Sequence, residues 1–121
     1  SSEWGIAGAT ITAGKTVYFD AATGKWKLAD CDDATAAVRM SVKGGIALNG
    51  ASDGQPIAVL RSGDANIGAT LTPGQPYYLS STPGGICPLA DITTGKTYVL
   101  IGVATSASNL NVAINYTGVT A

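Results

Sequence analysis

The sequence contains no histidine, and this absence removes whole classes of catalytic site. Histidine is the residue most often used for general acid–base catalysis, and it is a common zinc ligand. A Ser-His-Asp or Cys-His arrangement is therefore impossible within the chain. The two cysteines, Cys31 and Cys87, cannot complete a usual tetrahedral zinc site without histidine. We expect a protein that is not an enzyme and that uses no metal or cofactor.

Charge is also scarce, at 12% of residues with a net charge of −1, whereas 45% of residues are apolar. Disordered chains show the opposite balance, so 121 residues of this composition predict one folded domain. The seven lysines and arginines are scattered and form no basic stripe for phosphates. No apolar run approaches the roughly 20 residues of a membrane span. We expect neither nucleic acid nor membrane as a partner, and a surface suited to packing against other protein.

Two cysteines in a chain of this size are too few for a disulfide framework. A disulfide needs Cα atoms within about 7 Å of each other, which a sequence does not establish. We expect Cys31 and Cys87 to be reduced and to act as small apolar residues.

The sequence indicates an internal duplication. Residues 8–30 match residues 68–91 at a shift of 60 positions, later 61, with several identical residues in the same order. The second parts of the two units agree more loosely, as in residues 45–47 and 102–104. Two copies are too few for a solenoid, so the pattern favours one pseudo-symmetric domain. We expect an N-terminal arm over residues 1–7, followed by a single β domain over residues 8–121 whose repeats cover 8–63 and 68–118.

Short strands separated by turns predict an all-β fold, either a compact small barrel or a sandwich. The expected strands are rich in β-branched and aromatic residues, and they cover 17–19, 56–61, 77–79, 98–104 and 110–116. In the last of these, Leu110, Val112, Ile114 and Tyr116 alternate with smaller or polar residues, which predicts one face on a core. Turns are expected at glycines 14, 24, 54, 74, 84 and 95.

The segment Asp33–Met40 contains the only helix signal. It predicts either one or two helical turns, with Asp32 or Asp33 as the N-cap, or an irregular loop.

Asp30, Asp32 and Asp33 form the only acidic cluster. Their spacing does not match an EF-hand loop, which needs a distal glutamate, and Glu3 is the only glutamate in the chain. A solvated, capping or turn role is therefore expected in place of a calcium site. Carboxylate pairs for glycoside hydrolysis could in principle come from Asp20, Asp30, Asp64 and Asp91. However, Asp30 and Asp91 occupy equivalent repeat positions, which indicates a repeated structural turn.

Exposed aromatic residues could bind sugars by stacking, but Tyr18 and Tyr78 recur at equivalent positions, which favours packing roles. Trp4 differs because it precedes the first repeat and has Ile6 beside it. Such residues anchor a terminal segment either on its own domain or on a neighbouring molecule. Trp4 and Ile6 are therefore the candidate partner-binding residues.

Several segments are similar to those of small structural proteins of tailed bacteriophages. The similarity lies in residues 45–51 with 54–59, in residues 77–86 leading into 88–91, and in residues 101–104. As a whole, the chain resembles most closely the capsid decoration, or cement, proteins, over about residues 8 to 118. Tail-fibre and other virion proteins contain similar segments.

The resemblance implies a binding function. A cement protein made in the host cytoplasm attaches to the capsid exterior as a homotrimer, contacts the major capsid protein and stabilises the shell. The alternative is a tail-fibre or baseplate-associated β domain with a structural or host-glycan-binding role. No catalytic residue is implied in either case.

Overall fold

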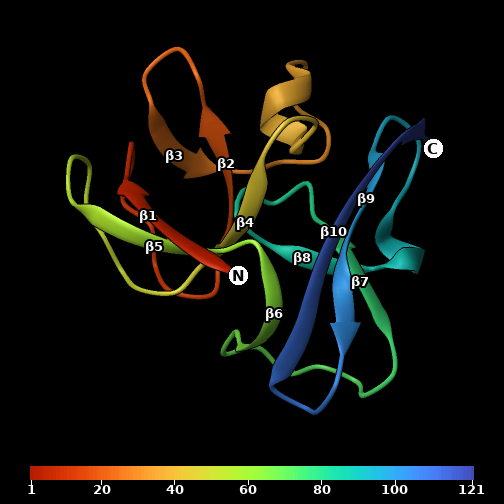
Figure 1. Ribbon diagram of the computed structural model, residues 1–121. Helices are drawn as coiled ribbons and strands as arrows, with labels where there is room; N and C mark the ends of the chain where they lie inside the picture. The colour runs from red at the N-terminus through yellow and green to blue at the C-terminus, as the bar shows by residue number, and fades with distance from the viewer.

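The computed structural model describes all 121 residues and is all-β, with ten strands in two five-stranded antiparallel sheets (Figure 1). The first sheet has the order β1-β5-β4-β2-β3 and contains β1 (Ser2–Ile6), β2 (Thr16–Asp20), β3 (Lys25–Leu28), β4 (Gly44–Ala47) and β5 (Pro56–Leu60). The second has the order β6-β10-β9-β7-β8 and contains β6 (Ser62–Asn66), β7 (Pro76–Leu79), β8 (Ile86–Pro88), β9 (Thr97–Ala104) and β10 (Asn109–Thr120). The expected all-β class is confirmed.

Each strand expected from the sequence lies within a strand of the structure, apart from the terminal Arg61. The alternation in β10 is also confirmed, because Leu110 and Val112 are buried while Asn111 and Ala113 are exposed. No helix of the structure has the length and apolar character that a membrane crossing requires.

The two halves of the chain build their sheets in the same way. Each sheet uses its five strands in the same relative order, so β1 to β5 correspond to β6 to β10. The corresponding turn glycines Gly14 and Gly74 have φ angles of 88° and 83°. Their N–H groups donate to Ala47 O and Ala104 O, each at 2.8 Å. An internal duplication predicts such paired contacts.

The first sheet curls until its outer strands meet. Ala7, directly after β1, forms a parallel bridge with Trp26 on β3, and Gly8 N–H donates to Trp26 O at 2.7 Å. The Trp26 side chain fills the interior and lies so close to Gly5 that a Cβ there would be 2.6 Å from the indole Nε1. The interior cluster consists of Ala7, Ile11, Val17, Trp26, Ala47, Ala51, Ile57 and Val59. Residues 1–7, expected as an arm, thus contain a strand of the first sheet and a buried alanine.

A second, larger core lies between the two halves. The first half contributes Tyr18, Ala29, Cys31, Met40 and Ile46, and the second half contributes Ile67, Leu71, Leu79, Val99, Ile101, Ala104, Leu110 and Val112. Only Arg61 separates β5 from β6, so the chain passes directly from the first sheet to the second.

The segment Asp33–Met40 contains one short 3-10 helix, η1 (Ala36–Arg39), and a second, η2 (Leu89–Asp91), follows β8. The expected N-cap at Asp32 or Asp33 is wrong, because Thr35 precedes the first helical residue and makes no side-chain cap. Asp33 Oδ1 accepts a hydrogen bond from Thr35 N–H at 2.9 Å. The aspartate therefore stabilises a turn before the helix, as short polar side chains often do.

Candidate functional site

The candidate residues Trp4 and Ile6 lie on β1, which pairs with β5 in a register that opposes Trp4 to Ala58 and Ile6 to Pro56. Side chains alternate between faces along a strand, so Glu3 points toward the sheet interior, Gly5 lies on that same face, and Trp4 and Ile6 point outward. Trp4 is 72% exposed and Ile6 is 39% exposed. The structure therefore does not bury Trp4 on its own domain.

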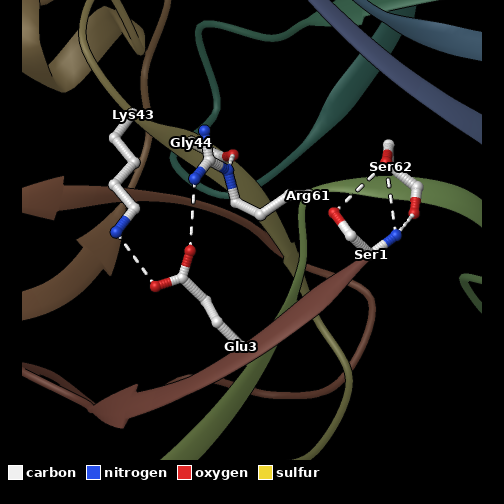
Figure 2. Close-up of polar contacts among 6 residues, drawn as sticks. All are labelled: Ser1, Glu3, Lys43, Gly44, Arg61 and Ser62. Carbon is white, nitrogen blue, oxygen red and sulfur yellow. Dashed lines mark hydrogen bonds and ion pairs between the residues drawn. The ribbon is translucent and has the colours of Figure 1, made fainter.

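The interior side of β1 is fixed by Glu3, whose carboxylate accepts from two cationic side chains (Figure 2). Lys43 Nζ lies 2.9 Å from Glu3 Oε2, and Arg61 Nη1 lies 3.2 Å from Glu3 Oε1. The hydrogen bond from Lys43 is the main cause that holds the pKa of Glu3 below its usual value. The Lys43 ammonium also lies over the Phe19 and Trp26 rings, 4.9 and 5.4 Å from their centroids. These contacts tie β1 to its neighbours while Trp4 stays free.

The apolar surface around Trp4 extends across three strands. Leu48 N–H donates to Ala58 O at 2.8 Å, which continues the β4–β5 pairing and places Leu48 opposite Ala58. Opposed residues of antiparallel strands share a face, so Leu48, which is 43% exposed, lies on the same side as Trp4. We call this surface the outer apolar face; it consists of Trp4, Ile6, Leu48, Pro56 and Ala58. None of these side chains carries a charge.

The second sheet shows that the fold does not need apolar residues at such positions. On the side of that sheet opposite to the core residues Leu110 and Val112, polar side chains predominate, and Val103 and Ala113 lie among them. Asp64 accepts from Thr105 Oγ1 at 2.9 Å and from Asn109 Nδ2 at 3.2 Å, and Asn111 is opposed to Asp64. An exposed apolar patch rimmed by polar residues is typical of an interaction site. The contrast between the sheets singles out the outer apolar face.

The aspartates of the acidic cluster form hydrogen bonds with backbone N–H groups of their own loop. Asp30 Oδ1 accepts from Asp32 N–H at 3.2 Å, and Asp33 bonds to Thr35 as described. Burial, followed by the neighbouring Asp32, raises the pKa of Asp30 to about 6. No group of three or more His, Cys, Asp or Glu side chains is placed to hold a metal ion.

The carboxylates considered for hydrolysis lie in separate contexts. Asp30 follows β3 and Asp91 ends η2 after β8, so both come after corresponding strands. Asp64 bonds to Thr105, and Asp20 pairs with Lys27 at 2.7 Å.

The cysteines and the recurring tyrosines belong to the packing. Cys31 and Cys87 are free and buried, and burial raises the pKa of the Cys31 thiol to about 11. Tyr18 is buried in the core between the halves, and the ring of Tyr78 packs edge-to-face on Tyr98 with centroids 6.3 Å apart.

Sequence reasoning missed Leu48, Pro56 and Ala58 as members of the outer apolar face, because their approach to Trp4 depends on strand register. It also missed the Glu3–Lys43–Arg61 cluster, for which the single glutamate of the chain was the available signal.

Comparison with known proteins adds no family assignment: no protein-family model matches the chain, and no curated protein matches it in sequence.

Proposed function

We propose that the chain is a virion structural protein that attaches to the outer surface of a phage capsid and stabilises the shell. The outer apolar face is the observation that carries the proposal, because it is an exposed, uncharged surface on β1 and its neighbouring strands, as a protein contact requires. The similarity of several segments to capsid decoration proteins supplies the identity of the partner, the major capsid protein. The proposed location is the capsid exterior, and the proposed assembly is a homotrimer.

The energetics suit a contact repeated over many copies. A tryptophan buries up to roughly 250 Å² of surface, so covering the exposed part of Trp4 removes on the order of 150 Å² from water. At about 25 cal/mol per Å² this contributes about 4 kcal/mol before the entropic cost of association. One such contact is weak, but the copies in a trimer bind together and gain affinity through effective concentration.

The first test is cryo-electron microscopy of the virus particle that encodes the chain. Density at junctions between major capsid subunits, with Trp4 at the contact, is the expected result. Density on tail structures alone would overturn the capsid assignment and favour the tail-associated alternative, in which Trp4 would stack on a host glycan. Absence from the particle would overturn both.

A second test uses co-sedimentation to compare how variants bind to capsids that lack the protein. Trp4→Ser is expected to weaken binding by about tenfold or more, with little loss of folding stability because Trp4 is mainly exposed. Val103→Ser is the matched control, since Val103 is an exposed apolar residue opposed to Asn111 on the polar side of the second sheet. Equal binding by both variants would exclude the outer apolar face as the contact. Analytical ultracentrifugation of the unmodified protein tests the trimer.

A further inference from the structure

A cleft opens where the first half of the chain meets the second half, between the segment after η1 and strand β10. Its volume is about 240 Å³. Apolar parts of Met40 and Val42 line it from the first half, and Ile114 and Tyr116 line it from the second. Val42 is 81% exposed, the highest exposure among the large apolar residues of the chain. The cleft lies apart from the outer apolar face, and none of its lining residues belongs to that face.

Arg61 is the only charged residue that lines this cleft. Its guanidinium is held in place by two hydrogen bonds, from Nε to Gly44 O at 2.9 Å and from Nη1 to Glu3 at 3.2 Å (Figure 2). A guanidinium has five N–H donors, so three remain without a partner in the chain. The Arg61 side chain lines the cleft, and it is 36% exposed, so part of it is open to solvent.

The local charge favours an anion. Glu3 is shared between Lys43 and Arg61, so the cluster of three side chains carries one net positive charge. No carboxylate lines the cleft to neutralise it. An oriented guanidinium binds a carboxylate through charge-assisted hydrogen bonds, which are stronger than neutral ones.

We propose that this cleft binds a carboxylate carried next to an apolar side chain on a protein partner. The guanidinium of Arg61 would bind the carboxylate, and Val42, Ile114 and Tyr116 would contact the apolar group. A cleft of about 240 Å³ has room for one side chain with its flanking backbone. The inference does not depend on the capsid assignment, because it uses a different part of the surface.

The test titrates small probes into the 121-residue protein and monitors binding by two-dimensional ¹H–¹⁵N NMR. N-acetyl-leucine presents a free carboxylate beside an apolar side chain, and N-acetyl-leucinamide has the same side chain without the charge. The expected result is that millimolar N-acetyl-leucine shifts the resonances of Val42, Arg61 and Tyr116, with an affinity about tenfold or more above that of the amide. Acetate is expected to bind more weakly than N-acetyl-leucine, because it lacks the apolar group.

Two variants at position 42, which are expected to fold normally because Val42 is 81% exposed, separate the outcomes. Val42→Asp places a carboxylate at the mouth of the cleft and is expected to abolish binding of N-acetyl-leucine. Val42→Asn has nearly the same size without the charge and is expected to retain weakened binding. Trp4→Ser is expected to leave the titration unchanged.

Three results would overturn the proposal: no shifts at the cleft, equal affinity for acid and amide, or equal affinity for acetate and N-acetyl-leucine. If Trp4→Ser loses capsid binding but still binds N-acetyl-leucine as the unmodified protein does, the cleft and the outer apolar face are separate binding sites.

Discussion

Gly45 lies on β4, the central strand of the first sheet, and Gly102 lies on β9, the central strand of the second. At each position the neighbouring strand of the same sheet leaves no room for a side chain. A Cβ on Gly45 would be 2.6 Å from Leu60 O, and a Cβ on Gly102 would be 2.9 Å from the carbonyl carbon of Asn111. Real Cβ atoms essentially never come this close to backbone atoms. Because these neighbours are backbone groups of a paired strand, they cannot rotate away. Alanine at either position must therefore push two paired strands apart.

We expect Gly45→Ala and Gly102→Ala each to lower the free energy of unfolding by about 3 kcal/mol, the upper part of the usual range for overpacking. Folded domains of ordinary size are stable by about 5–15 kcal/mol, so both variants are expected to remain folded. With a urea m-value of about 2 kcal/mol/M, the unfolding midpoint would fall by about 1.5 M.

Gly50→Ala is the matched control, because its Cβ would meet only Ile11 O at 3.8 Å, an ordinary contact. We expect this variant to stay within about 0.5 kcal/mol of the unmodified protein. Urea unfolding followed by tryptophan fluorescence measures all three. If Gly45→Ala and Gly102→Ala match the control, the close strand spacing on which the reasoning depends is refuted.

Further predictions concern the titrating groups and the buried thiols. Lys43 lowers the pKa of Glu3, so the charged Glu3 stabilises the fold above pH 4.5, and this stabilisation is lost as the pH falls through the lowered pKa. Glu3→Gln should lower the free energy of unfolding by about 0.5 kcal/mol at pH 7, measured by urea unfolding. A decrease that persists at pH 2 would contradict this. The pKa of Asp30 is raised to about 6, so its charged form destabilises the fold above pH 6, and this destabilisation disappears as the pH falls toward 4. Asp30→Asn should therefore raise the melting temperature at pH 7.5 but not at pH 3. An equal change at both pH values would contradict this prediction. Burial raises the pKa of Cys31 to about 11, so the native protein should react with a thiol reagent far more slowly than the urea-unfolded protein, and similar rates would contradict this.

The parts of the fold that could be predicted are those where local pattern and burial agree. Strand β10 alternates apolar and polar residues, and it lies with Leu110 and Val112 in the core. Strand β6 could not be predicted in this way, because its sequence, Ser-Gly-Asp-Ala-Asn, contains no β-branched or aromatic residue. It is a strand because β10 offers it an unpaired edge, and this is a tertiary effect.

Only part of the candidate site could be predicted from the sequence, because the rest of it depends on tertiary pairing. Trp4 was notable because it precedes the repeated units, which is a property of the sequence alone. The neighbours that complete the outer apolar face come from residues 48, 56 and 58, and they meet Trp4 only through the pairing of three strands. No short turn joins β1 to β5, so the turn geometry that fixes register in a hairpin is absent and the pairing depends on the tertiary fold.

The single-residue connection between the sheets has a mechanical consequence. Arg61 joins β5 to β6, its N–H donates to Ser1 O at 2.8 Å, and its side chain is bonded to Gly44. The core that the two halves share also restricts rotation of one sheet against the other. We therefore expect a load applied at β1 to pass to the second sheet through this short, hydrogen-bonded connection.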